Sequence, residues 1–442
     1  MSENAGTTDH YDALVIGAGA GGLCAAARLA HHGRHVLLAE SLDRVGGRAS
    51  SVEEDGCTVN TGAIAIEYGG VLEETFEEVG APFDIRVPVP ATMFRIKGKD
   101  LDISKGGWGK LINGITKKGA GLLNSLGDAR KGRMPDDALT VEQWLRGYTK
   151  NRTIHALFRN LCAAIFAVNA DEMPATAFLT YFFEKGAFKD YGFSPTGTLG
   201  VMQGLADVVV DRGGEVALNT RVEALHVADS QVVGATLSGP AGSREVTADV
   251  VISNAGPTAT SRLVGREHLS PEYLERLDSD LKPTANIVVN FTSRTALIDV
   301  PGILTFGITR RLCNMANLTA TCPELTPDDR HLYVAYGVPM PAVGDFDEEA
   351  EVEATLEDLR DELPGFDQEA TILSIRVMRG DWPAQRSVAG YDLPRETTLP
   401  NLFNVGDGVR EFANGGVQAC AETAKLVVDQ VLALAATAPA GR

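Results

Sequence analysis

A glycine triad near the start of the chain has the residue types and spacing that bind a dinucleotide. Residues 13–40, ALVIGAGAGGLCAAARLAHHGRHVLLAE, predict a buried strand, a glycine turn, an alanine-rich helix and a second strand. Gly17, Gly19 and Gly22 fall at the strand-to-helix turn, where they would permit a tight turn, close approach of a pyrophosphate and helix packing. Glu40 ends the second strand, where an acid accepts hydrogen bonds from an adenosine ribose. This unit predicts a dinucleotide site.

A second glycine turn follows soon after, in the run ESLDRVGGRASS. Here Gly46 and Gly47 precede the fixed cation of Arg48, and the later run TVNTGA ends at Gly62 and Ala63. These runs resemble the signature of the flavin-containing amine oxidase and phytoene desaturase superfamily. The resemblance implies that the cofactor is FAD, with the GGR turn along it and the TVNTGA strand and turn under its flavin.

Two segments in the middle of the chain continue the resemblance. Residues 194–225 predict a glycine turn, a helix and a strand that ends at Val222, whose backbone would meet the adenine. The run ADVVISNAGP, residues 248–257, is similar to the strand by which that family returns from its cofactor domain.

The last tenth of the chain predicts a strand end, a glycine turn and a new helix, in the run NVGDGVREFANGGVQACAE. The resemblance implies that this strand delivers Gly406 and Asp407 to the FAD, with the carboxylate on the ribityl chain. Gly416 and Val417 begin a helix whose amino terminus would point at the cofactor, because N–H groups there attract anions. Relatives with covalent flavin carry a cysteine just before this turn. This chain has none there, so we expect non-covalent FAD.

The resemblance implies an α/β fold, with a Rossmann-like FAD-binding domain of the GR2 type and an interleaved α+β substrate domain. At 442 residues the chain exceeds the usual size of one hydrophobic core. We expect a discontinuous FAD-binding domain of residues 1–66, 195–257 and 381–442. Residues 67–194 and 258–380 are expected to form the substrate domain, with a helix capped by Thr140 and Gln143.

Composition excludes several functional classes. A formal net charge of -19 argues against nucleic-acid binding, which needs a basic footprint. The six cysteines are scattered without metal-ligand spacing, so no metal site is expected. The amino terminus lacks the features of a signal peptide, and the apolar runs are too short to span a bilayer. The default expectation is a cytoplasmic enzyme.

One segment departs from the overall acidity. Residues 105–133 carry seven lysines and arginines against the single acid Asp128, and their apolar residues have a loose helical spacing. Such a patch predicts peripheral contact with an anionic membrane. The alternative is a solvated basic face whose apolar side lies in the substrate domain.

Four residues near the final strand are candidates for chemistry beside the flavin. Arg410 and Glu411 follow the Gly-Asp pair directly and could move protons, or could form a plain salt bridge. Trp382 could be a wall of the substrate slot, and Arg386 could orient an oxygen or phosphate of the substrate. A core tryptophan and a surface arginine are the alternative interpretations.

The substrate class depends on residues that face the flavin. Amine oxidases of the superfamily carry a lysine and an aromatic cage there, but Asn286 and Val417 stand at those positions, unless a shifted register brings in Lys282. The leading hypothesis is therefore a desaturase, dehydrogenase or isomerase acting on a small apolar molecule, isoprenoid-like or alicyclic. An amine oxidase that releases hydrogen peroxide and a non-catalytic FAD-bound scaffold are the alternatives.

Overall fold

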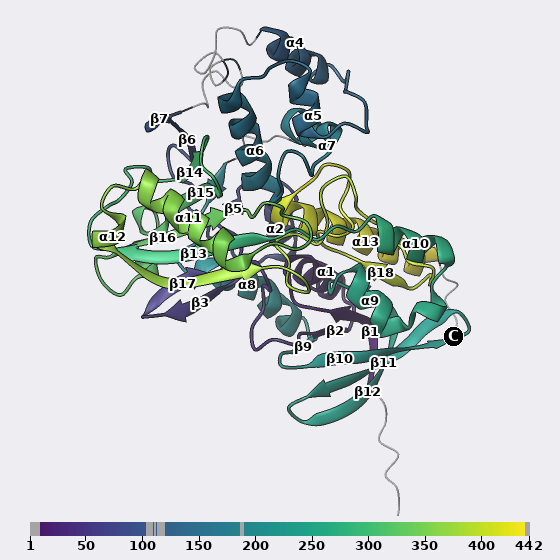
Figure 1. Ribbon diagram of the computed structural model, residues 1–442. Helices are drawn as coiled ribbons and strands as arrows, with labels where there is room; N and C mark the ends of the chain where they lie inside the picture. Colours follow the sequence, from purple (N-terminus) through teal and green to yellow (C-terminus); the bar gives the residue numbers. More distant parts are fainter. Residues whose placement is uncertain (1–8, 103–108, 110–111, 113–119, 186–189, 438–442) are drawn as a thin grey trace, which may run out of the picture.

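The computed structural model describes residues 9–102, 109, 112, 120–185 and 190–437. Its first sheet has seven strands, taken from both ends and the middle of the chain (Figure 1). Their order is β10-β11-β12-β1-β2-β9, with β18 beside β12. The strands are β1 (Asp9–Ile16), β2 (Val36–Ala39), β9 (Glu215–Ala217), β10 (Arg221–Ala228), β11 (Gln231–Gly239), β12 (Gly242–Ser253) and β18 (Leu402–Asn404).

The parallel strands of this sheet end together at one edge. β1 runs parallel to β2 and to β12, and β12 runs parallel to β18. Ile16 pairs with Ala39 and with Ser253, so the turns after these strands open at the same place. These turns begin at Gly17, Glu40, Asn254 and Val405.

Helices cover both faces of the first sheet. One face packs against α1 (Ala20–His31), α2 (Val71–Val79), α8 (Gly197–Asp211) and α13 (Gly416–Thr437). The other packs against α9 (Pro257–Val264) and α10 (Pro271–Ser279), next to a 3-10 turn (Arg266–His268). The Rossmann-like α/β architecture expected from the sequence is confirmed.

Two boundaries of the expected domains need correction. Apolar residues of α2 are buried in one core with α1 and α13, although residues 67–194 were assigned to the substrate domain. Likewise, α9 and α10 share a core with β10 to β12, although residues 258–380 were assigned there. The apolar faces of these helices are buried on the first sheet, and sequence spacing alone does not specify which sheet a helix covers.

A second seven-stranded sheet stands beside the first (Figure 1), in the order β17-β13-β16-β15-β14-β6-β7. Its strands are β6 (Thr92–Ile96), β7 (Lys99–Leu101), β13 (Asn286–Ser293), β14 (Ile303–Phe306), β15 (Leu312–Asn317), β16 (His331–Gly337) and β17 (Ala370–Met378). One face packs against α11 (Glu348–Glu362) and α12 (Phe366–Glu369). The other face packs on the pair β3 (Ser51–Glu54) and β4 (Cys57–Asn60) and on two 3-10 turns, Leu318–Ala320 and Pro323–Leu325.

A helical lobe lies above the two sheets in Figure 1. It contains α4 (Ala120–Ala129), α5 (Val141–Arg146), α6 (Arg152–Phe166), α7 (Ala175–Thr180) and a π-helix (Tyr181–Lys185). The expected cap of α5 is confirmed, because Thr140 and Gln143 form a reciprocal capping box. A short strand pair, β5 (Ile66–Glu67) and β8 (Tyr191–Gly192), lies close to this lobe.

The basic segment falls partly outside the described residues, which omit 103–108, 110–111 and 113–119. Within the described part, Ile112, Leu122 and Leu126 are buried in the core of the helical lobe. This burial agrees with the alternative in which the apolar side of the segment faces the protein. Membrane contact of this segment stays a prediction.

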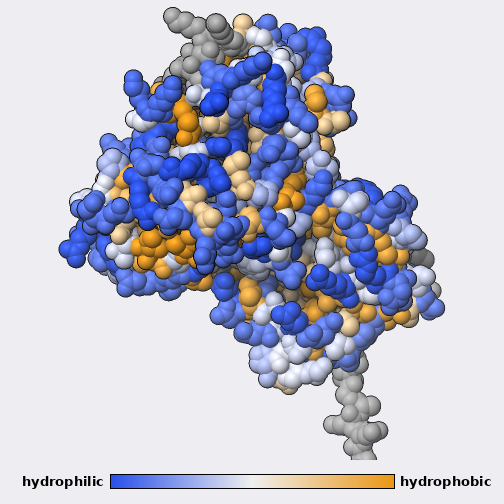
Figure 2. Space-filling view, in the orientation of Figure 1, coloured by the Kyte–Doolittle hydropathy of each residue, from blue (hydrophilic) through white to orange (hydrophobic). Residues whose placement is uncertain are grey.

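The visible surface is mostly hydrophilic (Figure 2), as the strong net charge requires. An apolar area lies over the edge strand β17, where Ile372 and Ile375 are partly exposed. Among the described residues, no helix combines the length and the apolar character needed to cross a membrane.

The contact between α1 and the first turn yields a stability prediction. A Cβ on Gly22 would overlap the carbonyl oxygen of Gly17, so Gly22→Ala forces α1 away from the sheet. We expect the free energy of unfolding in urea to fall by about 1–3 kcal/mol, as overpacked cores do.

Gly204→Ala is the matched control for this prediction. A Cβ on Gly204, inside α8, would only reach ordinary contact with Pro82, at 3.6 Å. We expect this variant to be as stable as the wild type or more stable, by up to about 1 kcal/mol. Equal losses in both variants would contradict the packing argument.

Candidate functional site

A cavity of about 750 Å³ opens along the edge where the parallel strands of the first sheet end. Its volume lies in the range of small-molecule sites, about 300–1,000 Å³. Most residues that the sequence assigned to the cofactor line it. They are Gly17, Gly19, Glu40, Gly46, Gly47, Arg48, Gly62, Ala63, Val222, Asp407, Gly416 and Val417.

Two of the expected cofactor residues lie behind the wall of this cavity. Gly22 packs α1 on the first turn, which is the packing role expected of it. Gly406 donates its N–H to Thr423 Oγ1 at 2.8 Å and lies against Gly21, so its expected contact with the cofactor is corrected to a packing role. Val222 does line the cavity, but it is the second residue of β10 rather than the end of a strand.

The amino terminus of α1 is open to an anion. Its N-cap is Gly19, and no side chain caps this end of the helix. The first N–H groups of the helix are therefore available to a ligand, and their dipoles favour negative charge. The second glycine turn adjoins the first, because Gly46 N–H donates to Ala18 O at 2.7 Å. Backbone groups from both turns thus form a cradle that fits a pyrophosphate.

Asn254 is a cavity residue that sequence reasoning missed. It follows β12 directly, and its Nδ2 lies 2.5 Å from where a Cβ on Gly19 would stand. Any larger residue at position 19 would displace this amide. The available signal was its place directly after a predicted parallel strand, in the run SNAGP, where ligands of such sheets bind.

Glu40 is buried at the far side of the cradle. Its Oε2 accepts the N–H of Ala18 at 2.6 Å, and its Oε1 accepts the N–H of Leu42 at 2.8 Å. Oε1 also accepts from the Ser41 hydroxyl at 3.2 Å, so Oε2 has the second lone pair with which Glu40 can brace this loop and still accept from a ribose hydroxyl.

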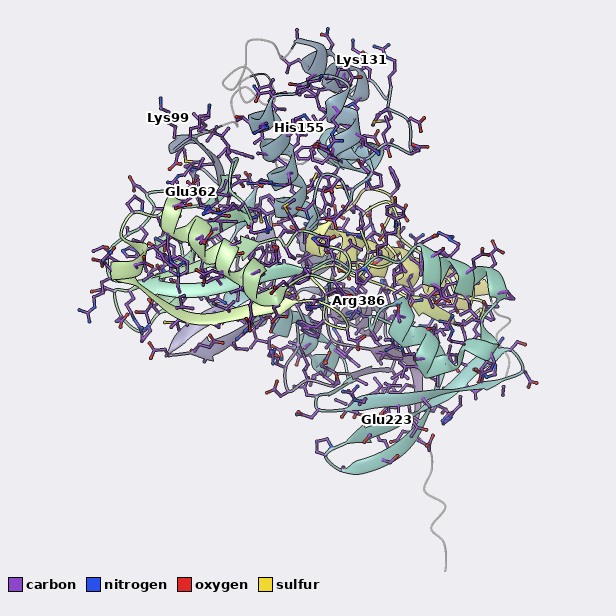
Figure 3. The ribbon with its side chains drawn as sticks, viewed as in Figure 1. Lys99, Lys131, His155, Glu223, Glu362 and Arg386 are labelled. Carbon is purple, nitrogen blue, oxygen red and sulfur yellow. The ribbon has the colours of Figure 1, made fainter. Side chains whose placement is uncertain are left out.

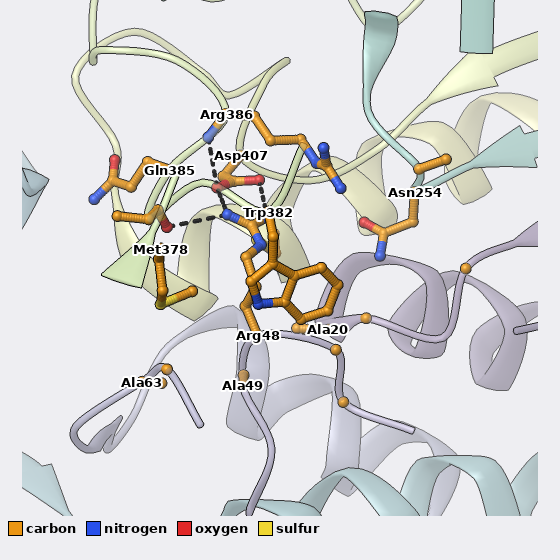
Figure 4. A pocket seen from close by; sticks show the side chains of 18 of the residues that line it. Ala20, Arg48, Ala49, Ala63, Asn254, Met378, Trp382, Gln385, Arg386 and Asp407 are labelled. Carbon is orange, nitrogen blue, oxygen red and sulfur yellow. Dashed lines mark hydrogen bonds and ion pairs between the residues drawn. The ribbon is translucent and has the colours of Figure 1, made fainter. Parts of the chain in front are cut away.

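A largely buried ion pair joins the two ends of the chain at the cavity (Figure 4). Arg48 donates to both oxygens of Asp407, at 2.7 and 2.6 Å. Burial acts to raise the pKa of Asp407, but the Arg48 guanidinium outweighs it and holds that pKa well below its usual range. The bidentate geometry fixes the carboxylate at the wall of the cavity.

Arg386 and Trp382 both line this first cavity, which we call the dinucleotide cavity, and neither lines the second cavity described below. Figure 3 places Arg386 near the middle of the molecule. Burial, together with the charge of Arg48, lowers the pKa of Arg386 to about 10. Arg386 is thus a half-buried cation in the wall of the cavity, and not the surface arginine of the alternative interpretation. Trp382 is 39% exposed, which excludes a core role.

Arg410 and Glu411 do not face either cavity, which corrects the expectation that they move protons beside the cofactor. Arg410 is held by Asp392 at 2.8 Å and by Gln385 at 2.6 Å. Glu411 pairs with Arg395 at the surface, so the two residues form separate ion pairs. Arg410 acts on the site through its neighbours: it orients Gln385, whose side chain stands at the cavity wall, and its charge helps to lower the pKa of Asp407.

A second cavity, of about 540 Å³, meets the first at the start of α13. We call it the apolar cavity, because aliphatic, proline and aromatic residues form most of its wall. Five residues line both cavities and define the junction between them. They are Ala63, Ala164, Ile165, Gly416 and Val417.

Two residues that line the dinucleotide cavity each have a buried polar atom without a hydrogen-bond partner among the described residues. These atoms are Asn286 Oδ1 and the Tyr336 hydroxyl. Both residues lie on one face of the second sheet, because Val288 pairs with Tyr336 and stands two positions after Asn286. Buried polar atoms normally have partners, so this pair fits polar atoms of a bound cofactor.

Lys282 does not replace the lysine that amine oxidases carry. Its Nζ lies 3.8 Å from the centre of the Tyr391 ring, and the residue lines neither cavity. The register shift considered from the sequence is therefore wrong. Asn286 and Val417 both line the dinucleotide cavity, at the positions where lysine and a cage tyrosine were considered.

Cys420 also lines this cavity, one turn into α13. Burial raises the pKa of its thiol to about 12, which keeps it protonated at neutral pH. A protonated thiol is a poor nucleophile, so this residue does not favour a covalent link to a cofactor.

Comparison with known proteins agrees with the geometry. The family model described as flavin containing amine oxidoreductase matches residues 20–432. A phytoene desaturase of Rhodobacter capsulatus is 28% identical, over 58% of this chain and 54% of that protein. The chain thus spans about half of this relative. A phytoene dehydrogenase of Streptomyces griseus is 26% identical, over 97% of this chain and 94% of that protein.

A solved structure has the same fold throughout. An oxidoreductase from Methanosarcina mazei superposes with a TM-score of 0.83 and 26% identity, covering 94% of this chain and 99% of that one. The match includes both sheets and the helical lobe, since so little of either chain is left out.

The Arg48–Asp407 pair yields a prediction for Asp407→Asn. This variant leaves a partly buried guanidinium without its charge partner, and breaking a pair costs up to about 3–5 kcal/mol where both groups are buried. We expect that loss in urea unfolding at pH 7, and a lower ratio of flavin absorbance to protein absorbance after purification. Asp211→Asn, an exposed carboxylate in α8, is the control and should change neither value.

The Arg48–Asp407 pair also predicts that part of the free energy of unfolding depends on pH in the acid range. Because the folded pKa of Asp407 is lowered, its stabilisation is present above the unfolded carboxyl pKa of about 3.9 and is lost as pH falls below it. The stability gap between wild type and Asp407→Asn should therefore narrow in acid. A gap that stays constant from pH 7 to pH 3 would contradict the assignment.

Proposed function

The chain belongs to the flavin-containing amine oxidoreductase family, as an FAD-dependent oxidoreductase, and from that premise we propose that it takes hydride from a C–H bond of an apolar molecule. The product would be a desaturated molecule, or an isomer where the hydride returns to another carbon. The observation that carries this proposal is the apolar cavity, which meets the dinucleotide cavity at the start of α13.

The chain's own residues account for binding and orientation of the cofactor. The open amino terminus of α1 and the Arg386 cation would hold the pyrophosphate, and Glu40 the ribose. Asp407 would meet the ribityl chain, while Asn286 and Tyr336 would orient the flavin end through their unpartnered atoms. FAD, when bound, supplies the two-electron acceptor.

The wall of the junction between the cavities is apolar. Ile165 and Val417 present aliphatic side chains there, and Ala63 and Ala164 leave room for a ligand between them. Hydride transfer benefits from a dry site, because water otherwise competes for charged groups and reactive intermediates.

The apolar cavity also bounds the size of the substrate. A cavity of about 150 Å³ holds one benzene ring. By the same proportion, the 540 Å³ of the apolar cavity would hold roughly twenty carbon atoms. An isoprenoid-like or alicyclic molecule of that size would be enclosed. A longer polyene would enter with one part of its chain.

Amine oxidation is the second candidate, and two positions disfavour it. Asn286 cannot supply the charge of the lysine, and Val417 offers no aromatic wall. A non-catalytic scaffold is disfavoured as well, because it has no use for an apolar cavity that opens on the flavin end.

The test is anaerobic bleaching of the bound flavin. The bleaching is monitored as the loss of flavin absorbance near 450 nm. The probes are 15-cis-phytoene, a cyclic enone, benzylamine and putrescine. We expect bleaching by a carbon donor and none by either amine. Rapid bleaching by an amine, with hydrogen peroxide on admission of air, would overturn the proposal in favour of amine oxidation.

Ala164→Phe tests the junction directly. The added ring would fill the passage between the cavities, and overpacking costs about 1–3 kcal/mol, so bleaching should slow by roughly 10- to 100-fold. Ala156→Phe, two turns earlier on α6 and away from both cavities, is the control and should bleach like the wild type. Equal bleaching rates in the two variants would show that the substrate does not pass through the junction.

A further inference from the structure

A buried carboxylate stands at the junction of the two cavities, on a residue that sequence reasoning did not single out. Glu67 ends the short strand β5 and is only 6% exposed. It lines the apolar cavity, and its Oε1 lies 3.4 Å from where a Cβ on Gly416 would stand. Gly416 lines both cavities, so this carboxylate lies beside the flavin end of the site.

A pair of tyrosines lies beside this carboxylate, and one of them bonds to it. Tyr191 is the antiparallel partner of Glu67 in the β5–β8 pair and forms a hydrogen bond with its side chain. The Tyr191 hydroxyl lies 3.4 Å from that of Tyr181, which also lines the apolar cavity. Burial raises the pKa of both tyrosines above their usual range, so both stay protonated: Tyr191 can donate to Glu67, and Tyr181 can donate to Tyr191.

Other acids near the site are less suited to proton transfer. Asp102 and Asp190 line the apolar cavity as well, but both are more exposed than Glu67. Glu40 lies at the ribose side and Asp407 is held by Arg48. Among the described residues that line the apolar cavity, Glu67 is the buried acid.

We propose that the Glu67 carboxylate is the proton acceptor of the reaction. The inference rests on the proposed function. As hydride leaves one carbon for FAD, the neighbouring carbon loses a proton to Glu67, and the electron pair of that second C–H bond forms the new C=C bond. The substrate is oxidised by two electrons, FAD is reduced by two, and the carboxylate becomes a carboxylic acid. For isomerisation, the hydride returns from the reduced cofactor to another carbon and the acid returns its proton, so neither the substrate nor the cofactor changes its oxidation state.

The first test measures the midpoint potential of the bound FAD by equilibration with a reference dye. Glu67→Gln removes a negative charge beside the flavin and should make the potential more positive, because reduction adds negative charge there. Glu74→Gln makes the same change at an exposed position of α2 and should leave the potential unchanged. An unshifted potential in Glu67→Gln would overturn the placement of an ionised carboxylate at the flavin.

The second test uses the anaerobic bleaching assay with the carbon donor that bleaches the wild type. Glu67→Gln should slow bleaching by about 100- to 10,000-fold, the usual contribution of a general base, with little change in the donor concentration for half-maximal rate. Glu67→Asp should recover part of the rate, because it restores a carboxylate. Unchanged flavin content and unfolding midpoint would show that these variants are folded.

The outcomes of the two tests separate the inference from the proposed function. Wild-type bleaching rates in Glu67→Gln would overturn the inference and leave the proposed function standing. If the wild type were neither bleached by any of the carbon donors nor able to isomerise them, the proposed function would fail for these donors. The potential of Glu67→Gln would then still decide whether an ionised Glu67 lies at the flavin.

Discussion

The ion pair between Arg48 and Asp407 is the constraint on which the rest of the site depends. It joins a turn near the start of the chain to the turn after β18, and both groups line the dinucleotide cavity. A buried pair of this kind is stable only in good geometry, with its charges satisfied. The Asp407 carboxylate also accepts the backbone N–H of Arg386, at 3.1 Å. Three segments remote in sequence are thereby held at one wall of the cofactor site.

The parts of the site that the sequence predicted are those set by local geometry. The glycine triad, Glu40 and the GGR turn follow strands whose apolar runs are evident, and parallel strands must end at a common edge. The position of Asp407 follows in the same way, because β18 is parallel to β12. Spacing along the chain therefore sufficed to predict the cradle and the Rossmann-like half of the fold.

The remaining residues depend on pairings between distant segments. Tyr336 reaches the dinucleotide cavity only through the register of β16 on β13, and Glu67 reaches the junction through β8, over a hundred residues later. The prediction that Arg410 and Glu411 lie beside the cofactor was wrong for the same reason. They follow Asp407 closely, but Asp392 and Arg395 draw their side chains away from the cofactor. Proximity in sequence does not determine the direction in which a side chain points.

The distribution of charge between the two cavities itself selects the kind of molecule that each can bind. The dinucleotide cavity has the cations of Arg48 and Arg386 and an open helix terminus, which suit the phosphates of a cofactor. The described residues that line the apolar cavity include acids but no lysine, arginine or histidine. A carboxylate or phosphate entering there would lose its hydration and meet Glu67 without compensation, which costs several kcal/mol. A hydrocarbon loses no such hydration, so electrostatics favours the same apolar substrate as the shape of the cavity does.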